Sequence, residues 1–320
     1  VIRGGYGIFF GFLGQRRGDV VQSGFTRDTN MVPTTDGINF IATLSNPFPN
    51  GILEPLGAAQ GPQTFIGQAI TYFNPKPLTP YNQRWELGFQ HELPGGILVE
   101  ASYVGNRGTH AEITRNLNVT PQKYLSKLAT RDNTTISYLT ANVPNPFFGI
   151  LPSTTTIGAS SNISRERLLR PFPAYDTVNT TTNDGYSWYH GLQTRLEKRF
   201  AKGYTFQASY TYSKFMQATE LLNQDDPKPT EVISDSDYPH RFAASGIWEL
   251  PFGNGKAFLA KSNGVVSRIV GGWQFQGVYT FQSGAPFGFG NVIYNGDLHN
   301  ITLPGDQQEV GHWFNPAGFV

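Results

Sequence analysis

The sequence contains no cysteine, so it can form neither a disulfide framework nor a thiolate metal site. Charge is also scarce: only 15% of the 320 residues are charged, and 24 Lys and Arg against 23 Asp and Glu leave a formal net charge of +1. This balance offers no basic face of the kind that non-specific nucleic-acid binding needs. We therefore expect no nucleic-acid partner.

Long apolar runs are missing as well. No stretch of about 18 apolar residues exists, so the sequence predicts no transmembrane helix, and the mean hydropathy of -0.32 is typical of a soluble protein. A transmembrane barrel strand, however, exposes only every second residue to lipid, so a chain of such strands averages out polar. Residues 1–6 lack the charged and apolar regions of a signal peptide, and we expect them to lie within a strand.

Glycine, proline and aromatic residues are abundant instead. The chain has 36 Gly, 22 Pro and 14% aromatic residues, where average usage is about 7% Gly and 5% Pro. Such a composition argues against a helical bundle or a coiled coil. Seven segments alternate apolar and polar residues over about 9 to 13 positions, the length that crosses a bilayer at a tilt.

The alternating segments are joined in pairs. In residues 204–212 the even-numbered positions are aromatic or Ala, and the odd-numbered positions are Ser, Thr or Gln. The predicted hairpins join 188–200 to 204–212, 85–93 to 97–106, and 242–250 to 273–281, and residues 2–12 supply the seventh strand. The third hairpin has the longest connection, which begins with the turn residues 251–255.

Long loops rich in Asn, Thr, Pro and Gly separate the hairpins. They cover about residues 13–83, 107–185, 215–239 and 284–320. Regular alternation of short turns with long loops is unusual in compact soluble domains and typical of outer-membrane barrels. The sequence thus predicts an all-β fold, an antiparallel up-and-down transmembrane β-barrel segment with long extracellular loops, and residues 1–320 as part of one barrel domain.

The two faces of the predicted strands differ in chemistry. The residues expected to face the lumen are Arg84, Glu86, Glu100, Arg195, Glu197, Arg241 and Glu249. The aromatic residues expected at the lipid interface are Trp85, Tyr103, Trp188, Trp248 and Trp273. A soluble β-sandwich would show the same alternation, but its strands are usually about 5 or 6 residues long and its loops short.

Several stretches, taken in order, resemble the TonB-dependent outer-membrane receptors of the Oar-like type, which carry a carboxypeptidase-regulatory-like domain and are common in Acidobacteria. The stretches are 80–88 (PYNQRWELG), 101–108 (ASYVGNRG), 189–193 (YHGLQ), 197–200 (EKRF), 209–214 (SYTYSK), 239–242 (PHRF), 250–253 (LPFG), 271–274 (GGWQ) and 283–287 (SGAPF). Together they cover most of residues 1–290.

The resemblance implies a receptor that imports a scarce or bulky solute, such as a siderophore, an oligosaccharide or a peptide. It implies an N-terminal domain, a plug inside the barrel, a segment that contacts the TonB complex, and about 22 strands. None of the first three is visible here, so we expect an internal fragment of the barrel. The seven lumen residues would then contact the plug, and the partners would be the lipid bilayer, lipopolysaccharide and the TonB complex, in the bacterial outer membrane.

Patterns for catalysis, cofactors or metals are missing, so we expect no enzyme and no cofactor. The six His residues show no metal-ligand spacing. Two loop clusters have alternative interpretations. Asp225, Asp226, Asp235 and Asp237 could bind calcium or simply be solvated, and Arg165, Arg167 and Arg170 could meet an anionic substrate or lipopolysaccharide or keep a loop tip soluble. The solvated interpretation is favoured for both.

Two other functions fit the same pattern. A passive porin or a surface-adhesion barrel would need the same strands without energy coupling, and a soluble secreted β-sandwich could bind glycans. The presence of a plug and a TonB-contacting segment would separate a receptor from a porin. Dependence on detergent would separate either barrel from the sandwich.

Overall fold

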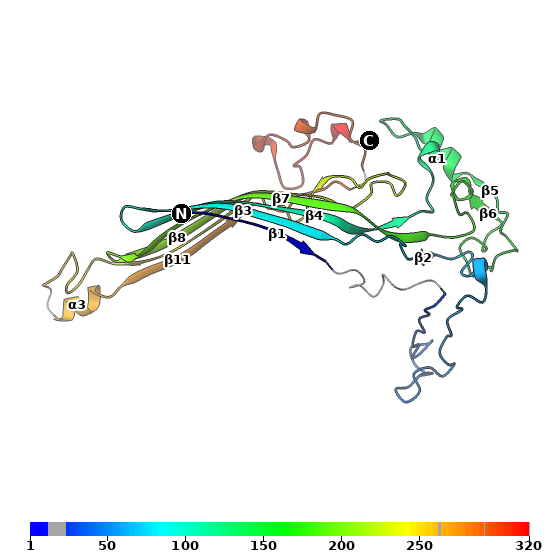
Figure 1. The fold of residues 1–320 in the computed structure, drawn as a ribbon, viewed down its shortest axis with the longest axis horizontal. Coiled ribbons are helices and arrows are strands. Elements are labelled where there is room, and N and C mark those ends of the chain that lie inside the picture. The colour runs from blue at the N-terminus through cyan, green and yellow to red at the C-terminus, as the bar shows by residue number, and fades with distance from the viewer. Residues whose placement is uncertain (12–23, 262–263, 291, 320) are drawn as a thin grey trace.

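The computed structural model describes residues 1–11, 24–261, 264–290 and 292–319 and contains one large curved sheet (Figure 1). Seven long strands form the sheet: β1 (Ile2–Phe10), β3 (Tyr81–Leu93), β4 (Ile97–Asn116), β7 (Val178–Ala201), β8 (Tyr204–Ala218), β10 (His240–Glu249) and β11 (Gln274–Gln282). Short β2 (Ile70–Tyr72) pairs in parallel with β7, and β9 (Val232–Ile233) pairs with β8. A separate small sheet pairs β5 (Asn142–Pro144) with β6 (Asn162–Ser164).

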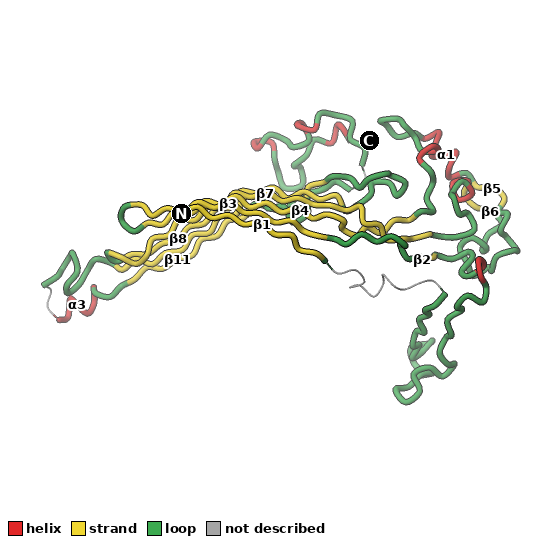
Figure 2. The backbone as a smooth tube through the Cα atoms, viewed as in Figure 1, coloured by secondary structure: helices red, strands yellow, loops and turns green. Residues whose placement is uncertain are grey.

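Helices are short and few in the described chain. They are α1 (Asn133–Thr140), α2 (Arg165–Leu168) and α3 (Gly264–Val270), with 3-10 turns at Gly61–Gln63, Gln122–Tyr124, Leu298–Asn300, Gly305–Gln307 and Pro316–Gly318. Figure 2 shows them in the loops at the margins of the long sheet. In the described part of the chain, no helix combines the length and the apolar character that a membrane-crossing helix requires.

The long strands follow one another in the sheet as they do in the chain. The order is β1-β3-β4-β7-β8-β10-β11, and each pair along it is antiparallel. This meander confirms the predicted all-β, up-and-down fold with seven strands. Within the described residues no second large sheet packs against it, as a β-sandwich would require. The sheet is not closed, because β1 and β11 form its two edges.

The turns and the long loops lie at opposite ends of the sheet (Figure 1). Leu93 and Ile97 pair across three turn residues, and Ala201 pairs with Tyr204 across Lys202 and Gly203. Both residues of the second turn have positive φ, 54° and 85°, as a type I′ hairpin requires. The third connection, from β10 to β11, contains α3 at the same end.

The central strands run further than their sequence pattern predicts. Pairing of β4 with β7 continues to Asn116 and Asn179, through a bulge at His110, whose φ is 60°. The predicted loop bounds 13–83, 107–185 and 215–239 are therefore too wide, because β3, β4, β7 and β8 occupy their margins. The apolar alternation ends where polar residues of the sheet are buried beside the long loops, so the pattern stops before the strands do. Phe12 and the first part of the predicted loop 13–83 lie outside the described residues.

Buried side chains gather at the long-loop end. We call residues 109–183 and 213–239 the loop cap. Its buried residues are Ile113, Asn118, Thr120, Asn145, Leu151, Thr155, Ile157, Val178, Thr180, Asn183, Ser213, Ala218, Ser234 and Asp237, while Ala42 and Lys198 are buried elsewhere. Many of these are polar and accept or donate hydrogen bonds within the cap. The long loops thus form a folded structure with its own small core.

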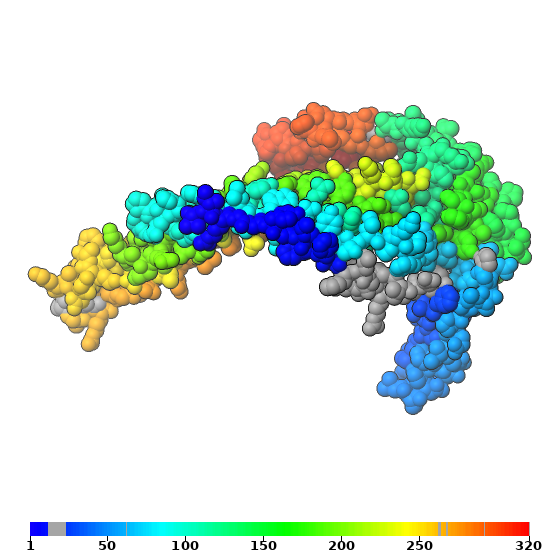
Figure 3. All heavy atoms as spheres, viewed as in Figure 1, coloured from blue at the N-terminus to red at the C-terminus, as the bar shows by residue number. Residues whose placement is uncertain are grey.

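Asn118 is the central polar residue of the loop cap. It is fully buried; its Nδ2 lies 2.9 Å from the carbonyl oxygens of Phe172 and Tyr175, and its Oδ1 accepts the Phe172 N–H at 2.9 Å. The cap also joins two loops, because Gln122 N–H donates to Asp225 Oδ2 at 2.8 Å and Arg115 Nη2 donates to the carbonyl of Asp226 at 2.7 Å. By contrast, residues 24–57 project away from the sheet (Figure 3).

The separation of turns from loops predicts accessibility in whole cells. Cysteine in place of exposed Lys127 or Lys228, both in long loops, should react with a membrane-impermeant maleimide added to intact cells, because extracellular loops face the medium. Cysteine in place of Lys202, in the β7–β8 turn, should react only after the outer membrane is permeabilised. Strong labelling at position 202 in intact cells would reverse the orientation.

Candidate functional site

The register of the sheet sorts the sequence-predicted residues onto two faces. Residues that pair across neighbouring antiparallel strands share a face. The row Glu100, Arg195 and Ser209 fixes one of these, which we call the polar face. By the same register all seven charged residues predicted for the lumen lie on the polar face: Arg84, Glu86, Glu100, Arg195, Glu197, Arg241 and Glu249.

Four of the five predicted interface aromatics lie on the opposite side, which we call the aromatic face. Trp85, Tyr103 and Trp188 are near its long-loop end, and Trp248 is near the turns. Trp273 precedes β11, outside the register, and its Nε1 donates to the carbonyl of Ile269. The register thus separates the seven charged residues from these four aromatics. Which face meets lipid and which meets the lumen stays a prediction.

The aromatic face is built around glycine. The indole of Trp85 covers Gly105, where an added Cβ would lie only 2.2 Å from the ring, so no other residue fits beneath it. Beside it, Tyr103 Oη and His190 Nδ1 are 2.6 Å apart. These amphipathic rings next to the long loops are typical of the level where a membrane-spanning strand meets lipid headgroups.

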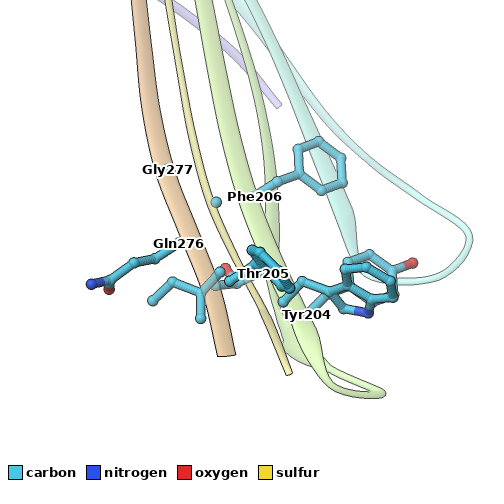
Figure 4. A pocket seen from close by; sticks show the side chains of 9 residues that line it. Tyr204, Thr205, Phe206, Gln276 and Gly277 are labelled. Atoms are coloured by element: carbon cyan, nitrogen blue, oxygen red, sulfur yellow. The ribbon is translucent and has the colours of Figure 1, made fainter. Parts of the chain in front are cut away.

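A hollow of about 640 Å³ near the turns involves both faces (Figure 4). It forms around Gly246 and Gly277, which pair with each other and leave no side chains there. Figure 4 shows Phe206 on one side of the strands and Gln276 on the other, as the alternation requires. The hollow is therefore a thin part of the wall and not a pocket with converging polar groups.

Some charged residues of the polar face toward the turns are paired with one another. Arg195 Nη2 lies 2.6 Å from Glu197 Oε2, and its Nη1 lies 3.9 Å from Glu100 Oε2. Near the turns, Lys256 Nζ lies 2.8 Å from Glu249 Oε2. These pairs reduce the cost of holding these charges on the wall.

The half of the polar face nearer the long loops contains a depression of about 600 Å³. Its lining includes Arg84, Glu86, Asn106, Tyr189, Gln193 and Phe215. Among the described residues, Arg84 and Glu86 form no ion pair. Charge marks Arg84 and Glu86 as site residues in the sequence but not the other four, although their positions in the alternation place all six on the same face.

Glycine and tyrosine together shape the floor of the depression. Tyr189 leans along its own strand over Gly191, where an added Cβ would be 2.6 Å from the Tyr189 hydroxyl. The ring of Phe215, from the next strand, meets Tyr189 edge to face with centroids 6.3 Å apart. The two aromatic rings thus form the floor of the depression, and amide and charged side chains lie beside them.

The arginine cluster and the aspartate cluster of the loops both form contacts within the loop cap. Arg167 pairs with Asp176, Arg170 with Glu166 at 2.9 Å, and Arg165 lies over the Tyr138 ring at 4.3 Å. These arginines therefore hold cap segments together and are not free charges on a loop tip. Asp225 and Asp226 accept hydrogen bonds from Gln122. In the described ranges no group of three or more His, Asp or Glu is placed to hold a metal ion.

Asp237 should be essential for the order of the loop between β8 and β10. It is 1% exposed and accepts the Phe215 N–H at 2.7 Å, so Asp237→Ala leaves that N–H without a partner, at a cost of about 1 to 3 kcal/mol. Asp237→Asn keeps an acceptor for that N–H and loses the pair with half-exposed Lys214, whose ammonium can turn to solvent, so this variant should cost less.

Limited proteolysis of intact cells measures this difference. Asp237→Ala should be cleaved within residues 219–239 faster than Asp237→Asn, and exposed Asp235→Ala serves as the control. Equal cleavage of Asp237→Ala and Asp235→Ala would show that the buried carboxylate does not order this loop.

The fold and its two faces define a class of protein. A meander of long antiparallel strands with tight turns at one end, long loops at the other, one aromatic face and one polar face is a wall segment of a transmembrane β-barrel. The whole chain, residues 1–320, matches the family described as "Outer membrane beta barrel domain", and the protein belongs to that family. It is therefore located in the bacterial outer membrane.

Individual proteins are much less similar to this chain than the family is. No curated protein matches the chain. Among solved structures, the chain is similar to the outer membrane transporter YddB from Escherichia coli, with 12% sequence identity and a TM-score of 0.30. The match covers 68% of this chain and 27% of YddB, so the chain spans about a quarter of the length of that transporter.

Proposed function

We propose that the chain forms part of the barrel of an energy-coupled outer-membrane receptor, of the TonB-dependent, Oar-like type, which imports a scarce or bulky solute. The observation that carries this proposal is the depression on the polar face. It lies at the long-loop end, next to a folded loop cap, and its two charged residues are free of ion pairs. A solute captured between the loops would meet this part of the wall first.

The partners in this proposal follow from the two faces. Lipid acyl chains and lipopolysaccharide would contact the aromatic face, and the plug would contact the polar face outside the depression, with Arg241 as a free partner for its charges. The TonB complex would act through a segment outside residues 1–320. The solute passes unchanged, without a chemical step or a cofactor, and nucleic acid plays no part.

A passive porin is the second candidate, because the polar face with its mixed charges would also suit an open pore. A surface-adhesion barrel would use the projecting residues 24–57 and the loop cap and would import nothing. A receptor needs an energy source, whereas a porin and an adhesion barrel do not. Only the receptor and the porin take up a solute. Energy dependence is therefore the property to measure first.

Growth under limitation separates the three functions. A strain that lacks the gene should lose growth on one limiting source of iron, oligosaccharide or peptide, and a strain that lacks TonB should lose the same growth. In a double mutant the two losses should not add. Growth loss without TonB dependence would indicate a porin, and lost surface attachment with unchanged growth would indicate an adhesin.

A further inference from the structure

The depression on the polar face has a chemistry that selects among the solutes a receptor could import. Its charged lining consists of one arginine and one glutamate, Arg84 and Glu86, so the site has no net charge. An anionic metal chelate or a phosphorylated solute is normally held by an excess of Arg or Lys. The lining therefore favours a neutral solute.

The backbone around the depression is already paired. β3, β4 and β7 each have neighbouring strands on both sides at this level, with Arg84, Asn106, Tyr189 and Phe215 in one continuous row. A peptide that binds by strand addition needs a free edge with unpaired N–H and C=O groups. The depression lies on a face and offers only side chains, which disfavours an extended peptide.

The remaining groups suit a sugar ring. Tyr189 and Phe215 provide apolar ring surface, and the C–H face of a pyranose packs against such surface. Asn106 and Gln193 provide amides, each of which donates and accepts, as sugar hydroxyls do. Arg84 and Glu86, two residues apart on one face, provide a donor fork and an acceptor for neighbouring hydroxyls.

We infer that the depression is a binding subsite for a neutral oligosaccharide, with Tyr189 as the stacking platform. Its volume of about 600 Å³ lies within the range of about 300 to 1,000 Å³ that ligand pockets occupy. This inference rests on the proposed function, because it places the solute on the inner wall of the barrel, along the path through the lumen. It selects the oligosaccharide from the three solute classes that the sequence leaves open.

Binding to the intact gene product, purified in detergent, tests the inference. The probes are maltohexaose, cellohexaose and xylohexaose, with ferric citrate and trialanine as the charged and peptidic alternatives, and titration calorimetry gives the affinity. At least one hexasaccharide should bind, and Tyr189→Ala should weaken it about tenfold or more through loss of the aromatic contact. Tyr212→Ala, an exposed tyrosine on the aromatic face, should leave the affinity unchanged.

A second variant separates binding from folding. Gly191→Ala places its Cβ against the flexible end of Tyr189, so the ring must shift while the strand pairing is kept. Heat-modifiable migration should stay normal and hexasaccharide affinity should fall. Absence of binding by all three sugars, or unchanged affinity in Tyr189→Ala, overturns the inference. Uptake of ferric citrate or trialanine that depends on TonB would overturn it too and leave the proposed transport function standing.

Discussion

Arginine in place of Ala208 should prevent assembly of the barrel in the membrane, whereas arginine in place of Gln207 or Ser209 should not. Ala208 lies on the aromatic face between Leu196 and Ala244. Arginine on the lipid face at the bilayer midplane costs about 2 to 4 kcal/mol. Ala208 is at the centre of residues 204–212, a nine-residue span that matches the roughly 9 to 11 residues a tilted strand needs to cross the bilayer.

The neighbouring positions provide matched controls on the other face. Gln207 pairs with Glu197, so Gln207→Arg gains an opposite charge across the strands. Ser209 pairs with Arg195, so Ser209→Arg adds a like charge that costs less than about 1 kcal/mol on a solvated wall. Neither side chain would enter lipid.

Membrane assembly of the three variants can be compared by heat-modifiable migration in the intact gene product. We expect little folded Ala208→Arg protein and near-normal amounts of the other two. If Ser209→Arg and Gln207→Arg assembled less well than Ala208→Arg, the polar face would be the one in lipid. The depression and its proposed ligand would then lie outside the lumen.

The sequence was informative where one face of a strand meets an apolar layer. In residues 204–212 and 85–93 the alternation located the strands, and it also separated the charged residues from the aromatic ones before any pairing was known. The loop-end parts of β4 and β7 escaped because polar residues such as Thr180 are buried there under the loop cap. When the residues that loops bury are polar, the sequence shows no alternation of apolar and polar residues.

Only part of the candidate site was visible in the sequence. Charge marked Arg84 and Glu86, but Tyr189 and Phe215 are aromatic residues on a polar face, and an alternation rule treats such residues as exceptions. Asp237 was marked only as one member of an acidic loop cluster, and Asn118 gave no signal at all. Asn118 is defined by partners 54 and 57 residues away, Phe172 and Tyr175, and a single sequence does not show such contacts.

Residues 1–320 expressed by themselves should not form a heat-modifiable monomer. The sheet has two free edges, the nine-residue strands β1 and β11, and every second residue of an edge strand directs its N–H and C=O outward. In hydrocarbon each unpaired group costs several kcal/mol, so the two edges together would cost on the order of tens of kcal/mol. Total stabilities of folded domains are about 5 to 15 kcal/mol and cannot offset that cost.

The intact gene product is the matched control, because closure of the barrel would pair both edges. Refolded in the same detergent, it should migrate faster unheated than heated on a gel, while residues 1–320 should aggregate or migrate as unfolded chain. Hydrogen exchange would locate the difference: in residues 1–320 the amides of β1 and β11 should exchange rapidly, and those of the central β4 and β7 should be the slowest. A folded, heat-modifiable monomer with protected β1 and β11 would show that these two strands can pair with each other, and that the barrel closes with seven strands.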